Sequence, residues 1–186
     1  MRGKKFLRVI SGSEKGKKIK IPKEKNIRPT KEKVKEAIFS ALQFEIEGKC
    51  FLDLFAGSGQ IGIEAMSRGA SEAIFVDNNP KSVGLIRKNL RSVDLFRKSS
   101  IFLSDATKFL KNTNLSFDLV FLDPPYAAKI LTDCLNLLTK KMRDGGIVVC
   151  ESAREAPSPE ITKNFIPRKC YYYGETKIII YDYIIK

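Results

Sequence analysis

From residue 50 onward, short apolar runs alternate with longer stretches in which apolar residues recur every three or four positions. This alternation is typical of strands and helices that follow one another along the chain and build a parallel sheet. The pattern predicts five buried strands, at residues 50–55, 73–77, 100–103, 119–123 and 147–151. Several of these strands end in a carboxylate, at the edge of the sheet where open α/β folds bind ligands.

Three amphipathic helices are predicted from helical spacing. Asn79 followed by Pro80 is typical of an N-cap and a first helical position, and apolar residues continue at helical spacing to Val93. A clearer apolar stripe covers residues 130–138. Thr30 is a natural N-cap for an earlier helix that ends near Leu42.

The two ends of the chain predict hairpins. Residues 169–173 and 176–183 are β-prone and are joined by Gly174 and Glu175. An antiparallel hairpin added to five parallel strands predicts an α/β, Rossmann-like, mostly parallel seven-stranded sheet. Ahead of the sheet, residues 6–10 and 18–21 predict a small basic β-hairpin. We therefore expect a basic extension over residues 1–30, followed by the main domain over residues 31–186.

The positive charge is concentrated at one end. The chain carries 34 Lys and Arg against 21 Asp and Glu, a formal net charge of +13. Residues 1–35 hold 14 basic and 3 acidic side chains and so account for 11 of these charges. A lysine-rich genomic composition would raise lysine along the whole chain and would not remove acidic residues from one end. The distribution therefore favours a segment that faces a polyanion.

The sequence contains no histidine. This excludes Ser-His-Asp hydrolysis, Cys-His nucleophiles, HExxH metallopeptidases and pH switches based on imidazole. Cys50, Cys134, Cys150 and Cys170 lie far apart with no CxxC pair, so we expect reduced structural thiols and no metal. The residues at the start of the sequence lack the apolar region of a signal peptide, and no apolar run approaches the length needed to cross a bilayer. We expect a cytoplasmic protein. We also expect a monomer, because the predicted core leaves no obvious surplus of apolar residues for an interface between subunits.

A glycine loop predicts a cofactor. Gly57, Gly59 and Gly62 form a G-x-G-x-x-G pattern between an apolar strand and a helix, which is the context of a nucleotide-binding turn. Asp77 closes the next strand and is placed to accept hydrogen bonds from ribose hydroxyls of a nicotinamide or an adenosyl cofactor. Asp53 would repel a pyrophosphate but attract the ammonium and sulfonium of S-adenosylmethionine. Alternatively, Asp53 only caps the loop.

Asp105 follows the third predicted strand. It is placed to accept a hydrogen bond from an adenine amino group, and an ordinary helix N-cap is the alternative. Because it is the third carboxylate at a strand end, beside Asp53 and Asp77, we favour a cofactor contact.

Asp123, Pro124, Pro125 and Tyr126 follow a buried strand. Neither proline has an N–H group, so this loop offers the carboxylate and a backbone carbonyl as acceptors. Two acceptors match the two hydrogens of an exocyclic amine, and the tyrosine ring can stack on a base. An amine held in this way directs its lone pair toward a methyl donor, so transfer needs neither histidine nor metal. The alternative is a rigid loop in which Asp123 is merely solvated.

These motifs, in this order, resemble the RsmD family of bacterial 16S ribosomal RNA guanine-N2 methyltransferases. The resemblance covers nearly the whole chain and includes Arg28-Pro-Thr30, the run at residues 51–65, Ser67-Arg-Gly-Ala70, the Asp-Pro-Pro-Tyr segment and the closing Tyr173-Gly174 hairpin. It implies methyl transfer from S-adenosylmethionine to the N2 amine of one guanine, position 966 in the family's naming, in small-subunit RNA. The partner would be the small ribosomal subunit or its assembly intermediate.

The resemblance also implies site residues. Asp123 and the Pro124 carbonyl would hold the guanine amine, with Pro125 shaping the loop and Tyr126 stacking on the base. The cofactor pocket would be lined by Asp53, Phe55, Ala56, Gly57, Gly59, Asp77, Asn78, Asp105 and Ala106. Contacts with RNA would come from Lys4, Lys5, Arg8, Lys17, Lys18, Arg28 and Thr30. Lysines stand where relatives usually have arginines in this flap, and lysine attracts phosphate without bidentate geometry.

Other functions account for part of the sequence. A DNA or RNA adenine-N6 methyltransferase would share the Asp-Pro-Pro-Tyr loop, but an enzyme that reads DNA sequence usually needs a further recognition domain. An NAD-dependent oxidoreductase accounts only for the glycine loop. A non-catalytic RNA-binding module accounts only for the charge.

Overall fold

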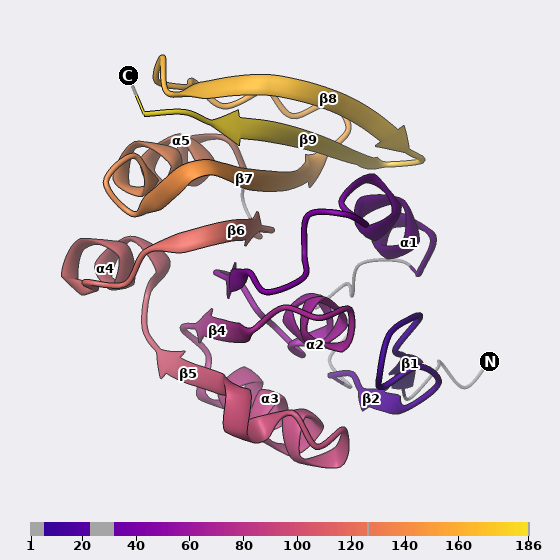
Figure 1. Ribbon diagram of the computed structural model, residues 1–186. Coiled ribbons are helices and arrows are strands. Elements are labelled where there is room, and N and C mark those ends of the chain that lie inside the picture. The colour runs from indigo at the N-terminus through magenta and orange to yellow at the C-terminus, as the bar shows by residue number, and fades with distance from the viewer. Residues whose placement is uncertain (1–5, 23–31, 126, 186) are drawn as a thin grey trace.

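The computed structural model describes residues 6–22, 32–125 and 127–185. Its elements follow the predicted alternation of strands and helices (Figure 1). In chain order they are β1 (Phe6–Arg8), β2 (Lys18–Lys20), α1 (Glu32–Ala41), β3 (Cys50–Asp53), α2 (Gln60–Ser67), β4 (Glu72–Asp77), α3 (Pro80–Ser92), a 3-10 turn (Phe96–Lys98), β5 (Ser99–Leu103), α4 (Ala106–Asn112), β6 (Phe117–Leu122), α5 (Ala127–Leu138), β7 (Met142–Ala153), β8 (Phe165–Tyr173) and β9 (Thr176–Tyr183).

The main sheet has seven strands in the order β5-β4-β3-β6-β7-β9-β8. The pairs among β3 to β7 are parallel, whereas β9 runs antiparallel to β7 and to β8. The predicted mostly parallel sheet with a C-terminal antiparallel hairpin is confirmed. After β3 the chain builds β4 and β5 on one side, and then returns to build β6 on the other. Such a reversal between β3 and β6 is where open α/β sheets bind ligands.

Two apolar layers cover the two faces of the sheet. Alternate residues of each central strand point to opposite faces, so Phe51 and Phe75 join one layer while Leu52 and Ile74 join the other. The first layer contains side chains of α1, α2 and α3, and the second contains those of α4 and α5. Burial on both faces explains why the central strands β3, β4 and β6 read as apolar runs. The prediction that residues 100–103 form a buried strand is wrong: β5 lies at the edge of the sheet, and Phe102 and Leu103 are exposed.

The predicted N-terminal hairpin is confirmed: β1 and β2 pair antiparallel. Val9 and Ile19 belong to the same core as the helices of the first layer. The backbone N–H groups of Ile10 and Ser11 donate to the carboxylate of Glu64 in α2, at 2.8 and 2.9 Å. The hairpin is therefore fixed against the main domain by shared core packing and by a buried acceptor.

The cysteines are free thiols, and Cys50, Cys134 and Cys150 are buried whereas Cys170 is exposed. Within the described ranges, no cluster of three or more acidic or thiol side chains is arranged to hold a metal ion. In the same part of the chain, the helices are too short or too polar to cross a bilayer.

Candidate active site

The strand register brings three carboxylates to one edge of the sheet. Asp53, the last residue of β3, pairs with Phe75 in β4 and with Phe121 in β6. Asp77 and Asp123 each lie two residues beyond those partners. Because side chains alternate along a strand, Asp77 projects from the same face as Asp53. Residues that are far apart in sequence therefore meet at the carboxyl ends of β3, β4 and β6.

Asp53 holds the start of α2. It is 1 % exposed, and its Oδ2 accepts a hydrogen bond from the backbone N–H of Gly62 at 3.0 Å. This bond supplies the acceptor that Gly59, the N-cap of α2, lacks. Loop capping, the alternative considered from the sequence, is thus part of what this side chain does.

The surroundings of Asp53 favour a cationic ligand. Burial raises the pKa of Asp53 to about 7; the hydrogen bond from Gly62 opposes this rise, and the negative charges of Asp123 and Asp77 add to it. Burial also raises the pKa of Asp123 to about 6. Positive charge placed among these carboxylates would favour their ionised forms and lower the pKa of each.

Asp77 organises the glycine loop. Its Oδ2 accepts from the N–H of Gly57 at 2.8 Å, and its Oδ1 accepts from the N–H of Asn79 at 2.8 Å. Gly57 and Gly59 have positive φ angles of 54° and 78°, which a side chain would disfavour. The loop between β3 and α2 is therefore fixed by a side chain from the neighbouring strand.

Gly62 is required by close packing. A Cβ at this position would lie 2.3 Å from the ring of Phe75 in β4. The third glycine of the motif therefore lets α2 approach the sheet, which is the role expected of it in a nucleotide-binding turn.

The other predicted cofactor residues follow the carboxyl ends of β3, β4 and β5 and differ in exposure. Ala56 is buried and donates its N–H to the Val76 carbonyl at 3.0 Å, whereas Phe55 is half-buried and Asn78 is exposed. Asp105 caps α4: its Oδ1 accepts from the N–H groups of Thr107 and Lys108 and from the Thr107 hydroxyl. These bonds hold the pKa of Asp105 below its usual value. Ala106 is the buried first residue of α4.

The Asp-Pro-Pro segment follows directly after β6. Asp123 is half-buried, Pro124 is buried and Pro125 is exposed. Tyr126 lies outside the described residues. The buried proline fixes the chain beside Asp123, and neither proline competes for its carboxylate because neither has an N–H group.

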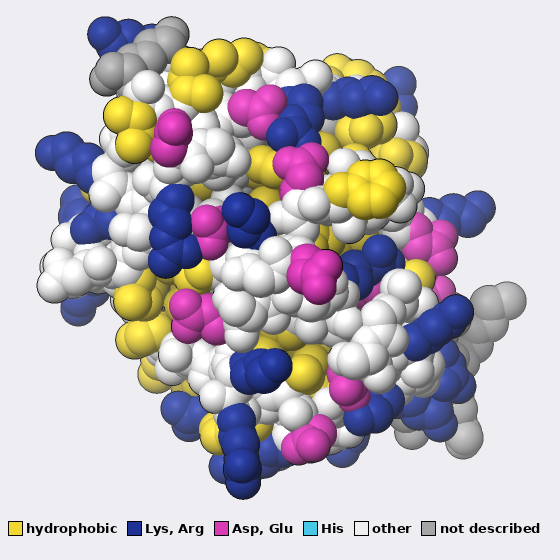
Figure 2. Space-filling view, viewed as in Figure 1, with side chains coloured by type: hydrophobic (Ala, Val, Ile, Leu, Met, Phe, Trp, Pro, Cys, Tyr) yellow, Lys and Arg dark blue, Asp and Glu magenta, His cyan; other side chains and the backbone are white. Residues whose placement is uncertain are grey.

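Of the predicted RNA contacts, Arg8, Lys17 and Lys18 lie exposed on the N-terminal hairpin. Lys4, Lys5, Arg28 and Thr30 lie outside the described residues. The space-filling view shows basic side chains gathered near the hairpin, at the lower right, and dispersed elsewhere on that face (Figure 2).

Two buried polar residues were not predicted as functional. Asn89 of α3 donates to the carbonyls of Ser58 and Lys20, and Glu64 of α2 accepts from the hairpin backbone and forms an ion pair with Lys35 at 3.1 Å. The only signal in the sequence is a polar residue on the apolar side of an amphipathic helix. That signal shows that a partner is needed but not which one.

Solved structures place this architecture in a known class. The Escherichia coli protein yhhF aligns with a TM-score of 0.89 at 27% identity, over 97% of this chain and 99% of that chain. An RNA methyltransferase from Salinibacter ruber, solved with S-adenosyl-L-homocysteine, has a TM-score of 0.67 at 15% identity over 86% of this chain and 95% of that chain, and so shares the fold. The fold is that of Rossmann-like methyltransferases.

Sequence comparison then gives the family. The model of the family described as Conserved hypothetical protein 95 matches residues 7–182. YlbH of Bacillus subtilis is 37% identical over 180 residues, covering 94% of this chain and 98% of YlbH. Ribosomal RNA small subunit methyltransferase D of Escherichia coli is 31% identical over 178 residues, covering 95% of this chain and 89% of that protein. The chain belongs to this family, the RsmD family of methyltransferases, as its sequence motifs predicted. It is an enzyme of the methyltransferase class.

Proposed function

We propose that the protein transfers a methyl group from S-adenosylmethionine to the N2 amine of a guanine in the RNA of the small ribosomal subunit. The observation that carries the proposal is the position of the Asp123-Pro124 segment. It follows β6, the strand that pairs with β3, and β3 leads into the glycine loop. An amine held at Asp123 would therefore lie beside a cofactor held by that loop.

The residues present fit S-adenosylmethionine better than a dinucleotide. The Asp53 carboxylate accepts the backbone N–H of Gly62 in the first turn of α2. A pyrophosphate would need such N–H groups as donors and would be repelled by the carboxylate. The three neighbouring carboxylates suit an ammonium and a sulfonium. Asp77 would meet the ribose hydroxyls, with Phe55, Ala56, Asn78, Asp105 and Ala106 around the adenosine. When bound, the cofactor supplies an electrophilic methyl group.

The amine is activated by the acceptors that hold it. The Asp123 carboxylate and the Pro124 carbonyl accept hydrogen bonds from the two N–H groups of the amine, and Tyr126 stacks on the base. The N2 lone pair forms the new bond to the methyl carbon while the bond from that carbon to sulfur breaks, and its electrons remain on sulfur. The nitrogen then loses a proton to Asp123. Holding both hydrogens provides the orientation that in-line transfer requires.

The basic N-terminal extension, residues 1–30, is proposed to bind the RNA backbone through Lys4, Lys5, Arg8, Lys17, Lys18, Arg28 and Thr30. The relative from Escherichia coli is named for the small subunit RNA, which supports the choice of substrate. A guanine stacked inside an RNA helix cannot reach the half-buried Asp123 carboxylate, so the target base must be unstacked first.

Labelled-methyl transfer tests this function. The protein would be incubated with labelled S-adenosylmethionine and with small ribosomal subunits, free ribosomal RNA or DNA, and the modified base would be mapped. We expect N2-methylguanine in the ribosomal RNA. N6-methyladenine would replace the proposal with its nearest alternative. Calorimetry should detect S-adenosylmethionine binding and no NAD binding, and the reverse result would overturn methyl transfer.

A further inference from the structure

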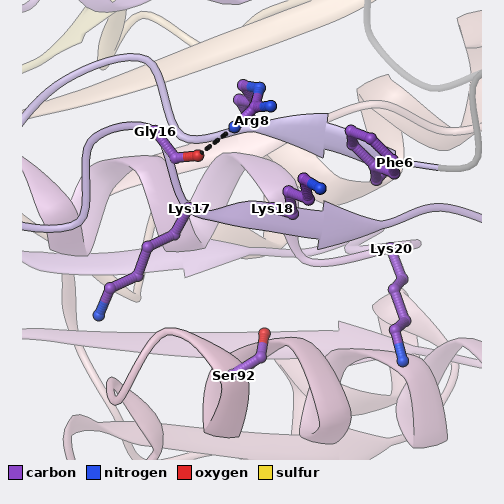
Figure 3. Close-up of a pocket in the computed structure, with 7 residues that line it drawn as sticks. All are labelled: Phe6, Arg8, Gly16, Lys17, Lys18, Lys20 and Ser92. Carbon is purple, nitrogen blue, oxygen red and sulfur yellow. Dashed lines mark hydrogen bonds between the residues drawn. The ribbon is translucent and has the colours of Figure 1, made fainter.

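A basic groove lies on the N-terminal hairpin. It has a volume of about 550 Å³ and runs between the hairpin and the C-terminal end of α3 (Figure 3). Its lining residues are Phe6, Arg8, Gly16, Lys17, Lys18, Lys20 and Ser92. None of them belongs to the carboxylate cluster at the strand ends. The volume falls within the usual range of small-ligand sites.

The register of the hairpin sets the composition of this surface. Phe6 pairs with Lys20 and Arg8 pairs with Lys18 across the two strands. Leu7 and its partner Ile19 point inward and are buried. Because side chains alternate, three cations and one aromatic ring occupy the outer face of the hairpin.

Two of these cations oppose each other directly. Like charges opposite one another in an antiparallel pair are destabilising, so Arg8 and Lys18 weaken the hairpin that carries them. Lys17 forms an ion pair with Glu14, whereas Arg8, Lys18 and Lys20 have no ion pair within the described part of the chain. The groove therefore concentrates positive charge that an anion would neutralise.

An aromatic ring lies among these charges. Phe6 is 38 % exposed, with Lys18 Nζ 4.5 Å and Arg8 Cζ 5.9 Å from its ring centroid. Arg8 Nη1 also donates to the Gly16 carbonyl at 2.8 Å, which fixes its position. An exposed ring flanked by cations is the combination with which proteins stack bases and neutralise the adjoining phosphates.

On the opposite wall, Ser92 offers a hydroxyl. Its Oγ donates to the Asn89 carbonyl at 2.7 Å, so the oxygen remains an acceptor. Lys17 and Lys20 extend toward α3 on either side of Ser92 (Figure 3). A hydroxyl acceptor at this place suits a ribose 2′-hydroxyl, which distinguishes RNA from DNA.

We propose that this groove binds an unpaired nucleotide of the substrate RNA, at a site separate from the one that holds the target guanine. The inference rests on the proposed function and extends it. The base lies against Phe6, the phosphates contact Arg8, Lys18 and Lys20, and Ser92 meets the ribose. A paired base cannot expose its face to Phe6, so the groove selects single-stranded RNA over a duplex.

Binding assays with matched oligonucleotides test the proposal. A short labelled single-stranded RNA would be compared with an RNA duplex of the same length for the wild type, Phe6→Ala and Phe6→Tyr. We expect Phe6→Ala to weaken single-strand binding at least about fivefold and to leave duplex binding unchanged, while Phe6→Tyr retains the wild-type affinity. Equal losses for both RNAs, or none, would overturn the stacking role. Preference of the wild type for the duplex, or for anionic vesicles, would overturn the assignment of the ligand.

A charge-matched control isolates the groove. Arg8→Gln/Lys18→Gln should reduce the slope of log affinity against log salt by about 0.7 per lost phosphate contact. The control Lys111→Gln/Lys140→Gln removes two exposed charges, one in the last turn of α4 and one in the turn after α5, and should leave the slope close to that of the wild type. Equal changes of the slope in both double variants would show that the charges of the groove act only nonspecifically on RNA binding, and would overturn the proposal.

Methyl transfer distinguishes failure of this inference from failure of the proposed function. If the wild type methylates no RNA, the proposed function fails. If the wild type methylates ribosomal RNA and Phe6→Ala has an unchanged KM for that RNA, the proposed function stands and only the proposed nucleotide site in the groove is ruled out. We expect Phe6→Ala to raise the KM for RNA while the affinity for S-adenosylmethionine stays unchanged.

Discussion

The side-chain amide nitrogen of Asn89 lies 2.9 Å from the carbonyl oxygen of Ser58, inside the glycine loop, and 2.9 Å from the carbonyl oxygen of Lys20 in β2. The Asn89 amide oxygen accepts the N–H of Lys20 at 3.0 Å. Asn89 is 1 % exposed. One buried side chain on α3 thus satisfies backbone groups of both the N-terminal hairpin and the glycine loop.

Replacing Asn89 by alanine should loosen both segments. Asn89→Ala leaves buried backbone groups without partners, which costs about 1–3 kcal/mol of unfolding free energy. We also expect weaker binding of S-adenosylmethionine, because the loop loses a bond that holds Ser58. Urea unfolding and calorimetry measure the two effects. Asn136→Ala, at an exposed position on α5, is the matched control. Unchanged cofactor affinity in Asn89→Ala would show that the loop does not depend on this bond.

Asp53→Asn should raise the stability of the protein and weaken its binding of S-adenosylmethionine. The pKa of Asp53 is raised to about 7 from its ordinary value of 3.8, so ionising this side chain is less favourable in the folded protein than in the unfolded chain. Asp53 therefore lowers the unfolding free energy progressively as pH rises between these two values. Asparagine keeps an acceptor for Gly62 and does not ionise. We expect Asp53→Asn to be more stable than the wild type at pH 8, by up to about 4 kcal/mol, and equal to it near pH 4. Its affinity for S-adenosylmethionine should fall.

Thermal unfolding across this pH range and calorimetry at pH 8 measure both quantities. The difference between variant and wild type isolates Asp53 from other titrating groups. A stability difference that does not vary with pH would contradict the raised pKa, and unchanged cofactor affinity would remove Asp53 from the cofactor site.

The rate of methyl transfer should depend on ionisation of Asp123. Its pKa of about 6 means that the carboxyl becomes protonated as pH falls through 6, and a protonated carboxyl loses one of its acceptor positions. We expect kcat/KM, which reports ionisations of the free enzyme, to fall on the acid side with a midpoint near 6. Asp123→Ala should abolish transfer and retain cofactor affinity, whereas Asp133→Ala, an exposed carboxylate on α5, should retain activity. Wild-type activity in Asp123→Ala would exclude the proposed role.

The ion pair between Lys35 and Glu64 should be necessary for folding of the N-terminal half. Both side chains are fully buried at 3.1 Å, and Lys35 Nζ also donates to the Arg8 carbonyl at 3.0 Å. Burial lowers the pKa of Lys35, and the charge of Glu64 opposes that change. Glu64→Leu leaves a buried cation without its partner, which costs about 3–5 kcal/mol.

Denaturant unfolding measures this cost, and a double variant tests its cause. Lys35→Met/Glu64→Leu removes both charges and should recover part of the lost stability. The exposed pair of Arg154 and Glu155 provides the control, since Glu155→Ala should not change stability measurably. A double variant no more stable than Glu64→Leu would assign the loss to the unpaired N–H groups of Ile10 and Ser11 instead.

The elements of the fold could be predicted because their signals are local. Apolar runs gave the strands, helical spacing gave α3 and α5, and a turn at Gly174 gave the C-terminal hairpin. The strand predicted over residues 50–55 ends at Asp53 in the structure, because the chain there leaves the sheet to begin the glycine loop. A run of apolar residues does not mark where pairing stops.

The contacts among site residues could not be predicted to the same extent. The sequence placed carboxylates at strand ends but left open whether Asp53 and Asp105 cap backbone groups or meet a cofactor. The structure shows that both carboxylates cap helices, through bonds to Gly62 and to Thr107. Their roles toward the cofactor stay predictions, as does the role of Tyr126.

By itself, the sequence determined the class of the fold, the glycine loop, the carboxylates that follow the strands and the basic N-terminal segment. Only the tertiary structure decided which groups satisfy one another. Asp53 meets an N–H group nine residues away, whereas Asn89 meets one 69 residues away. Periodicity and local motifs arise from neighbours along the chain, and a sequence displays them directly. Buried hydrogen bonds and ion pairs depend on the path of the chain in space, and that path is fixed only when the strands take their order and the hairpin packs against α2 and α3.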